Sequence, residues 1–515
     1  MNIKFYSKNS LNLILLIILI LCCSLRLVNL AALPNGVLPD EAYAAYNAFG
    51  LLTEGIDARG YTNPVYFVAW GSGMSSGYSY LSLPFLYFLG VSIFAFRLPM
   101  ALLSICTCIS MYVIGKELYD AKIGAIFFFF MTINPWHIMN SRFALDANLA
   151  PNLFLIAVCF LILGLKRAKF KYYIGFSIFT GLVLYGYAQS WIMMPLFIVL
   201  VLLYYWRELP KRFPLFLLGF IIFVFALPLL LFVIINMGYM DEIRTSWISI
   251  PKLASFRSDE VHLSNIISSL IDTIRVVLLQ SDGISYTSSL LVGAYYTITT
   301  PFIILGILKH IKDFIVSLLE KKRDPSIVLF FGLISASIIC LLNQNITIIH
   351  INLIHIPIIF YSCYGMIVVA EFFHNKYVIP LTCLCMSLSC ILFYTEYATT
   401  YDSHFFDERS VEAIEAAKSL ATDDTPIIIS TYATIKYSNL FWTELPEVSR
   451  YYEEVIYTGD PGWQELESFD GFEYIATWSD ATKPGIYIIL TAERQQYAML
   501  GYQIETINDL YALAY

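Results

Sequence analysis

Apolar stretches of roughly membrane-spanning length recur through the first 395 residues of this 515-residue chain. A helix needs about 20 predominantly apolar residues to cross the hydrocarbon core of a bilayer. Eleven stretches approach that length: 11–33, 98–115, 122–138, 150–165, 172–188, 191–206, 213–236, 286–308, 327–343, 347–370 and 377–395. Because only 14% of the residues are charged and 58% are hydrophobic, a soluble enzyme and a disordered chain are excluded. The sequence therefore predicts an all-α, multi-pass membrane domain with about 11–13 transmembrane helices.

Basic clusters separate alternate pairs of these stretches and set the predicted sidedness, because loops rich in Lys and Arg stay in the cytoplasm. The clusters are Lys116/Lys122, 166–171, 207–212, 309–323 and Lys376. This rule predicts a cytoplasmic N-terminus and outer segments at 34–97, 139–149, 189–190, 237–285 and 344–346. The apolar segment from Tyr78 to Phe96 would reverse the order if it spanned. We therefore expect it to be a helix lying at the outer interface and ending at Arg97.

The last part of the chain differs from the rest in its charge and its periodicity. From residue 396 onward acidic side chains far outnumber basic ones, whereas the preceding part has a basic excess. Short apolar or alternating segments predict strands near 426–430, 454–457, 472–476 and 485–490, and helical spacing predicts helices at 407–420 and 491–499. We therefore expect a small α/β extracytoplasmic domain at 396–515. The transmembrane domain would then cover 1–395, with its first outer loop at 34–97.

The positions of the Cys residues and the acidic charge of the tail limit the binding partners and the cellular compartment that the sequence predicts. All ten Cys residues lie in apolar stretches and none lies in the acidic tail, so a disulfide-built domain is excluded. This distribution points to a bacterial cell membrane. The acidic tail argues against nucleic-acid binding. No spacing of ligands requires a cofactor, although a divalent metal is compatible with the sequence.

Asp40 and Glu41 directly follow the first apolar stretch, on the predicted outer side. Two adjacent carboxylates can act as a general base and its orienting partner. The alternative is structural, because acidic residues after Pro39 suit the first turn of a helix.

Charged residues that border a bilayer are costly unless they are paired or functional. Arg142 and Asp146 lie in the predicted outer segment 139–149, where Arg142 suits a phosphate and could alternatively pair with Asp146 one helical turn away. Arg97 either reaches toward lipid head groups or faces the carboxylates.

Polar residues at two further outer positions are candidates for substrate binding. Asp57, in the first loop, is either a binding residue or a solvated charge. His350 and Asn352 open a late helix, where an imidazole and an amide could bind a sugar hydroxyl, a phosphate or a metal. His350 and His355 do not share a helix face well, which disfavours a metal site built from two His residues.

Several motifs, taken in order, resemble the polyprenyl-phosphate-dependent glycosyltransferases. These are bacterial relatives of the protein O-mannosyltransferases (glycosyltransferase family 39) and of the lipid A aminoarabinose transferase, with the GT-C fold. The motifs are Leu38-Pro-Asp40-Glu41, Gly55-Ile-Asp57-Ala-Arg59-Gly, Tyr80…Pro84…Gly90…Phe96-Arg97-Leu-Pro99 and Asn134-Pro-Trp136-His…Ser141-Arg142…Ala147-Asn148. The resemblance departs from many relatives at Ser75-Ser-Gly-Tyr78, where they carry Lys-Pro-Pro.

The resemblance implies a membrane enzyme that transfers a sugar from a polyprenyl-phosphate donor on the outer face of the membrane. The acceptor would be a hydroxyl group of a glycan, lipid or protein. Asp40 would be the catalytic base with Glu41 beside it, and Arg142 would face the donor phosphate. Tyr80, Arg97, Asp146, Asp57, His350 and Asn352 would line the substrate site. The sequence leaves open a polysaccharide polymerase or ligase that uses lipid-linked oligosaccharide, and less favourably a transporter.

Overall fold

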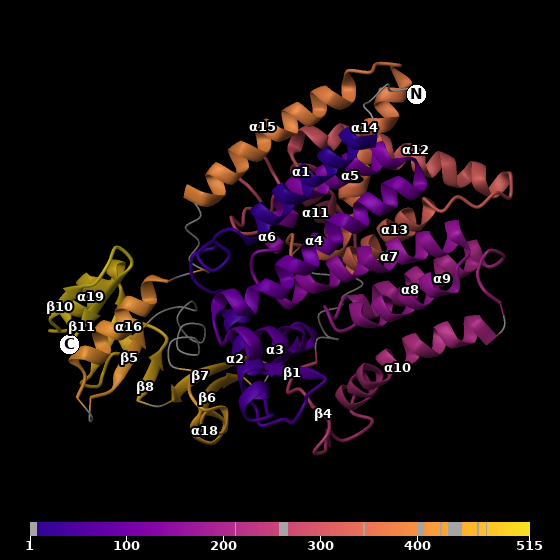
Figure 1. Ribbon diagram of the computed structural model, residues 1–515. Helices are drawn as coiled ribbons and strands as arrows, with labels where there is room; N and C mark the ends of the chain where they lie inside the picture. The colour runs from indigo at the N-terminus through magenta and orange to yellow at the C-terminus, as the bar shows by residue number, and fades with distance from the viewer. Residues whose placement is uncertain are drawn as a thin grey trace. The chain divides into compact units, whose positions relative to one another are not determined.

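The computed structural model describes residues 8–211, 213–256, 266–342, 346–399, 406, 408–422, 425–430, 445–460, 463–469 and 471–515 (Figure 1). The chain forms two compact units, neither of them continuous in sequence. Unit 1 comprises Met1–Leu30, Leu98–Leu229 and Ser258–Tyr401, and unit 2 comprises Ala31–Arg97, Leu230–Arg257 and Asp402–Tyr515. The predicted domain boundary near residue 396 stays a prediction. Residues 1–7 and most of the predicted outer turn 344–346 lie outside the described residues.

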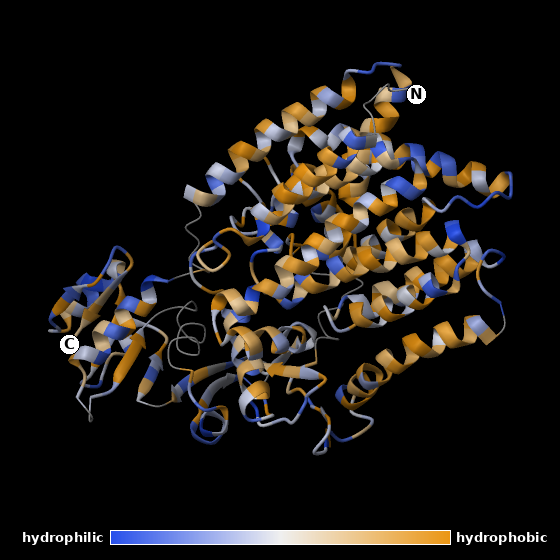
Figure 2. Cartoon of the chain, viewed as in Figure 1, coloured by the Kyte–Doolittle hydropathy of each residue, from blue (hydrophilic) through white to orange (hydrophobic). Residues whose placement is uncertain are grey.

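Unit 1 is helical, and hydrophobic residues dominate its helices (Figure 2). Its helices, two of which continue into unit 2, are α1 (Lys8–Leu27), α4 (Ile93–Leu118), α5 (Ala121–Ile133), α6 (Pro135–Asn140), α7 (Leu149–Arg167), α8 (Phe170–Val183), α9 (Ser190–Tyr205), α10 (Phe213–Asn236), α11 (Ile266–Leu279), α12 (Thr300–Leu319), α13 (Ile327–Leu342), α14 (His355–Phe372) and α15 (Val378–Thr399). Most of α7 and α14 is buried, so these two helices form the centre of the bundle.

Each of the eleven predicted stretches overlaps a helix, and the predicted all-α membrane domain is confirmed. Within the described residues, six helices are long and apolar enough to cross a membrane: Asn9–Leu27, Ile93–Leu118, Asp146–Arg167, Phe213–Asn236, Asn352–Phe372 and Val378–Thr399. The apolar helices α5, α9 and α13 have fewer than 18 residues. In the part of the chain that the structure describes, fewer helices reach full spanning length than the 11–13 transmembrane helices predicted.

Two predicted boundaries are wrong. The helix expected at 286–308 begins only at Thr300, because the buried Gln280 side chain bonds the backbone N–H of Tyr295 at 2.9 Å and the carbonyl of Tyr296 at 3.2 Å, which holds this segment in a non-helical turn. The interfacial helix expected from Tyr78 to Phe96 is divided. It forms α3 (Gly77–Leu89) and the start of α4, because Gly90 adopts a φ of 80° that ends the first helix.

Helix α11 lies within the segment that the sequence predicted as an outer loop. Unlike a surface helix of a soluble protein, it exposes its apolar side chains and buries polar ones. Its 14 residues extend about 21 Å, too short to cross a bilayer core. Its three faces differ. The exposed stripe contains Ile267, Leu270, Ile271, Ile274 and Leu278; the adjacent stripe contains Ser268, Asp272 and Arg275; and the buried face contains Ser269, Thr273 and Val276. This pattern is typical of a helix lying in the membrane interface.

We therefore predict that spin labels on neighbouring residues of α11 report opposite environments. A label at Ile271 should be accessible to oxygen, which concentrates in the bilayer, because the exposed stripe is apolar. A label at Asp272 should instead be accessible to a water-soluble nickel reagent. The measurement is electron paramagnetic resonance of protein in liposomes, and equal nickel accessibility at both positions would contradict it.

Unit 2 contains a seven-stranded mixed sheet in the order β10-β11-β9-β5-β8-β7-β6. The strands are β5 (Ile427–Ser430), β6 (Ile456–Asp460), β7 (Trp463–Phe469), β8 (Phe472–Ile475), β9 (Ile486–Leu490), β10 (Ile504–Thr506) and β11 (Tyr511–Ala514). The central strand β5 pairs in parallel with β8 and β9, and the other pairs are antiparallel. All four residues of β5 are buried, as expected for a strand covered on both faces. The predicted α/β fold of the tail is confirmed.

Further elements of unit 2 come from the tail and from its two earlier segments, Ala31–Arg97 and Leu230–Arg257. The tail adds α16 (Arg409–Leu420), α18 (Val448–Glu454) and α19 (Arg494–Met499). The first loop forms α2 (Pro39–Thr53), α3, and the hairpin β1 (Tyr66–Ala69) and β2 (Ser72–Ser75). The segment after α10 forms the hairpin β3 (Ile243–Arg244) and β4 (Ser249–Ile250). The first loop and the tail therefore fold together.

Candidate active site

Asp40 lies in the first turn of α2, where the local sequence favours a helix start. Leu38 has an extended backbone, and Pro39 occupies the first helical position, where its missing N–H costs nothing. Carboxylates in the first turn interact favourably with the positive end of the helix dipole. The Asp40 side chain is half-buried, whereas that of Glu41 is 1% exposed. The two adjacent carboxylates therefore occupy different environments.

Glu41 forms a buried, bidentate ion pair with Arg97. The Arg97 Nε and one terminal nitrogen donate to the two carboxylate oxygens of Glu41, each at 2.8 Å. The remaining N–H groups of Arg97 donate to backbone carbonyls of Ala31 (3.4 Å), Pro34 (2.9 Å) and Gly36 (2.6 Å). The five donors of the guanidinium are thus all directed at protein oxygens. Arg97 faces a carboxylate, and the pair joins the start of α4 to the first turn of α2.

Breaking this pair should destabilise the protein strongly. Glu41→Gln and Arg97→Met should each cost about 3–5 kcal/mol, because each leaves a buried charge without its partner. The double variant should lose less than the sum of the two. Thermal unfolding in detergent, followed by intrinsic fluorescence, measures these effects.

Glu454→Gln is the matched control, because the Arg450–Glu454 pair is about half exposed and should contribute less than about 1 kcal/mol. Equal shifts in the unfolding temperature for Glu41→Gln and Glu454→Gln would refute the role of the buried pair.

Arg142 holds the C-terminal end of α1. Its side chain is fully buried and donates to the carbonyls of Leu25 (2.8 Å), Val28 (2.7 Å) and Asn29 (3.0 Å). The last carbonyls of a helix lack partners within the helix and carry the negative end of its dipole, so a guanidinium satisfies both requirements. The sequence predicted that Arg142 contacts a phosphate. In this conformation its described hydrogen bonds instead go to backbone carbonyls of the protein.

The predicted outer segment 139–149 meets the start of the predicted late helix through a cluster of amides. Asn352 Nδ2 donates to the Ala147 carbonyl at 2.7 Å and to Asn148 Oδ1 at 3.2 Å, and its Oδ1 accepts from Asn140 at 3.3 Å. Asn352 is therefore fully buried, whereas Asp146 and His350 beside it are half-buried. The structure thus brings the 139–149 segment and the 350–355 segment together.

The sequence reasoning missed a second buried polar centre, formed by Arg26 and His137. Arg26 donates to the Thr132 carbonyl at 3.0 Å and contacts His137 Nδ1 at 2.7 Å, and His137 Nε2 contacts Asn152 Oδ1 at 3.1 Å. The signal was present, because Arg26 is a charge inside the apolar stretch 11–33 and such residues are costly unless partnered.

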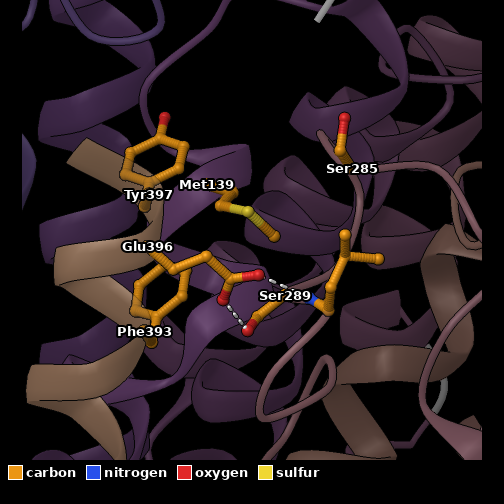
Figure 3. A pocket seen from close by; sticks show the side chains of 7 residues that line it. Met139, Ser285, Ser289, Phe393, Glu396 and Tyr397 are labelled. Atoms are coloured by element: carbon orange, nitrogen blue, oxygen red, sulfur yellow. Dashed lines mark hydrogen bonds between the residues drawn. The ribbon is translucent and has the colours of Figure 1, made fainter. Parts of the chain in front are cut away.

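Glu396 points toward Ser289 across a small pocket of unit 1 (Figure 3). Its carboxylate accepts hydrogen bonds from Ser289 Oγ and, at 2.9 Å, from the Leu290 backbone N–H. Met139, Ser285, Phe393 and Tyr397 complete the lining of a cavity of about 40 Å³. This volume admits a few water molecules but not a sugar. Glu396 therefore connects the end of α15 to the segment before α12 and does not line a substrate cavity.

Asp57 is a fully buried carboxylate of the first loop. Its Oδ1 accepts from the backbone N–H groups of Arg59 (3.0 Å) and Tyr61 (2.8 Å), whereas its Oδ2 is buried and has no hydrogen-bond partner among the described residues. Burial raises the pKa of Asp57 to about 7, against the opposing effect of the two backbone hydrogen bonds. Asp57 therefore stabilises the first loop through these two buried hydrogen bonds and is not a solvated charge.

The raised pKa predicts a pH dependence of stability. Between about pH 4 and pH 7 the folded protein binds more protons at Asp57 than the unfolded chain does, so the stability contributed by this group falls as the pH rises through that window. Asp57→Asn keeps the Oδ1 acceptor and cannot ionise. The variant should lose this dependence in unfolding measurements between pH 4 and pH 8, and an unchanged pH profile would contradict the assignment.

The predicted site residues fall into two groups. Asp40, Glu41, Asp57, Tyr80 and Arg97 belong to unit 2, where the Tyr80 hydroxyl donates to the Pro64 carbonyl at 3.0 Å. Arg142, Asp146, His350 and Asn352 belong to unit 1. Within the described parts of both units, no group of three or more His, Cys, Asp or Glu side chains is placed to bind a metal.

Residues 77–232 match the family described as dolichyl-phosphate-mannose-protein mannosyltransferase. The fold is similar to that of ArnT from Cupriavidus metallidurans in the apo state, with a TM-score of 0.54, 10% identity, and coverage of 98% of both chains. It is also similar to the apo oligosaccharyltransferase from Archaeoglobus fulgidus, with a TM-score of 0.56, 13% identity, and coverage of 96% of this chain and 71% of that chain. No curated protein sequence matches the chain.

Other structures of these proteins contain ligands. One of ArnT, which is 11% identical with a TM-score of 0.52 over 99% of this chain and 98% of that chain, is bound to undecaprenyl phosphate. Structures from Archaeoglobus fulgidus are described as complexes with an inhibitory peptide and a dolichol-phosphate, and with Zn and sulfate. The expected fold, similar to that of ArnT, is thus confirmed, and residues 77–232 resemble the dolichyl-phosphate-mannose-protein mannosyltransferase family.

Proposed function

We propose that this protein transfers a sugar from a polyprenyl-phosphate donor to an acceptor hydroxyl on the outer face of the membrane, with Asp40 as the general base. The observation that carries the proposal is the contrast between the two adjacent carboxylates. Asp40 is half-buried in the first turn of α2, whereas both oxygens of Glu41 are bonded to Arg97. Asp40 is therefore the more accessible of the two.

The proposed reaction is a single displacement. The Asp40 carboxylate takes the proton from the acceptor hydroxyl, whose oxygen forms a bond to the anomeric carbon as the bond from that carbon to the phosphate oxygen breaks. The polyprenyl phosphate leaves with the electron pair, and the anomeric configuration inverts. A retaining route would need a second carboxylate as nucleophile. The ion pair of Glu41 supports the inverting route, because it holds that carboxylate away from solvent.

Glu41 is accordingly proposed as a positioning residue for Asp40 and not as a second catalytic group. Arg97 would act through Glu41, and Arg142 would position the 139–149 segment by holding the end of α1. Asp146 and His350, which are half-buried next to the Asn352 cluster, are then the predicted donor-binding residues of unit 1 that remain accessible. A neutral or protonated imidazole at His350 can donate a hydrogen bond to a phosphate oxygen.

The proposed orientation follows from the basic clusters. Loops rich in Lys and Arg would lie in the cytoplasm, which puts the N-terminus inside and the tail outside. Structures of ArnT and of an archaeal oligosaccharyltransferase hold undecaprenyl phosphate and dolichol-phosphate, which supports a lipid-phosphate donor here. The acceptor is proposed only as a hydroxyl group of a glycan, lipid or protein, and a divalent metal stays a prediction.

The direct test is transfer of radiolabelled sugar from a panel of polyprenyl-phosphate sugars in membranes that contain the protein. Asp40→Asn should reduce transfer by at least about 100-fold, because general-base catalysis typically contributes 10²–10⁴-fold. Asp241→Asn, an exposed acidic residue of the same unit, is the matched control and should retain full activity.

Three results would contradict the proposal. Full activity of Asp40→Asn at normal expression would place the base elsewhere. Transfer that occurs only from lipid-linked oligosaccharides would favour the polymerase or ligase. A response of activity to chelator and its recovery with added Zn²⁺ or Mg²⁺ would add a metal to the reaction, and the single-base mechanism would then be revised.

A further inference from the structure

We propose that tail residues 446–460 and Gln464 form a clamp on α2 and the loop after it, and that this clamp holds Asp40 in its working position. All the residues that make this contact belong to unit 2, whereas its link to catalysis rests on the proposed function. The contacts of the tail indicate a supporting role, because the tail packs against the helix that carries the proposed base. We call residues 446–460 together with Gln464 the clamp.

The first contact joins the C-terminal end of α2 to the start of α18. Glu54 directly follows α2, and its two carboxylate oxygens accept from the backbone N–H groups of Val448 (2.6 Å) and Ser449 (2.9 Å). These are N–H groups of the first turn of α18, which lack partners within that helix. Although partial burial opposes it, these hydrogen bonds lower the pKa of Glu54. A carboxylate of the first loop thus caps a helix of the tail.

The second contact lies on the buried face of α2. The Tyr46 hydroxyl donates to the Pro446 carbonyl at 3.0 Å, and the Tyr46 ring packs edge-on against Tyr451 with the ring centroids 5.5 Å apart. Gly50, one turn further along α2, allows a close approach, because a Cβ there would lie 2.7 Å from a methyl carbon of Val448. The sequence places small and aromatic residues of α2 where the clamp packs.

The third contact uses Arg59, in the loop after α2. Its guanidinium lies over the Tyr457 ring with its central carbon 3.9 Å from the ring centroid, and it donates to Gln464 Oε1 at 2.9 Å. Gln464 also donates its backbone N–H to the Trp70 carbonyl at 3.0 Å. Gly60 has a φ of 72° and lies against Tyr452, leaving no room for a Cβ. The clamp therefore contacts α2, the loop after it and the β1–β2 turn.

These contacts bear on the position of Asp40 through the geometry of a short helix. Asp40, Tyr43 and Asn47 follow a spacing of three and four residues and so share one face of α2. Tyr43 and Asn47 are buried, and Asn47 binds the loop after α2 by accepting from the Ala58 N–H at 2.9 Å. Since α2 is one rigid element of 15 residues, fixing its second half fixes the direction in which its first turn points. Glu54 and Arg59 are therefore assigned as positioning residues.

The test combines hydrogen exchange with kinetics in the full-length protein. Glu54→Ala and Gln464→Leu remove one contact from each side of the interface, and the double variant removes both. Amide exchange of residues 39–53 should accelerate by about tenfold relative to α7, since each lost contact is a hydrogen bond to a charged group. The kcat of transfer should fall by a similar factor, while the KM for the donor stays within about twofold.

Two further variants distinguish the clamp from a general loss of structure. Glu54→Gln keeps one acceptor oxygen and should recover part of both effects. Lys483→Met breaks the Lys483–Glu473 ion pair of the tail, outside the clamp, and should change neither the exchange of α2 nor kcat.

Each other outcome overturns part of the proposal. Unchanged exchange of α2 in the double variant would overturn the clamp, whatever the activity. Faster exchange with unchanged kcat would overturn its link to catalysis. If the wild-type protein shows no transfer that depends on Asp40, the proposed function fails and the catalytic link fails with it, while the exchange data still decide whether the tail holds α2.

Discussion

The buried ion pair between Glu41 and Arg97 is the interaction on which the proposed site depends. A carboxylate and a guanidinium removed from water are each costly, and the cost is offset only when the geometry is good and every donor has a partner. Here both conditions hold, because the pair is bidentate and three backbone carbonyls take the remaining N–H groups. The pair fixes the first turn of α2 and separates two adjacent carboxylates into a structural one and an accessible one.

The same physical constraint explains the buried polar residues of unit 1. A charge within a membrane domain must be paired or must bind backbone carbonyls. Arg142 binds carbonyls at the end of α1, and Arg26 binds carbonyls of α5 together with His137. These contacts join α1 to the segments that carry Asp146 and the Asn352 cluster. In both units, therefore, a buried arginine donates hydrogen bonds to backbone carbonyls next to a polar segment that is proposed to bind substrate.

The sequence predicted those parts of the structure that depend on local composition. The apolar stretches predicted most helices of the membrane domain but not α11, which lies in a segment expected to be a loop, and the continuous apolar runs at β5 and β9 predicted the buried strands of the tail. It missed β7, whose sequence alternates less regularly and contains two Glu residues, and it missed β10 and β11, which are short. It also missed the start of α12, because the turn there depends on the buried Gln280 side chain, a contact that no periodicity reports.

The candidate site also depends on contacts between residues far apart in the sequence, which local patterns do not predict. Asp40 and Glu41 were predicted together from their place after a spanning stretch, but nothing in the dipeptide tells which of them meets Arg97, 56 residues away. Arg142 was predicted as a phosphate ligand because guanidinium chemistry suits phosphate, and Arg97 as a residue of the substrate site that either reaches head groups or faces the carboxylates. The contacts that occupy them come from carbonyls of distant segments, so only the fold reveals them. The association of the first loop with the tail could not be predicted either, since it joins residues such as Tyr46 and Pro446, which are 400 positions apart.

The anomeric configuration of the product tests the central claim most directly, because it reports the number of displacements and hence the number of carboxylates that act. The measurement is nuclear magnetic resonance of the glycoside formed from a polyprenyl-phosphate sugar of known anomeric configuration. A single base at Asp40, with Glu41 held by Arg97, predicts complete inversion at the anomeric carbon. Retention would contradict the account, because it would require a second carboxylate to attack the sugar.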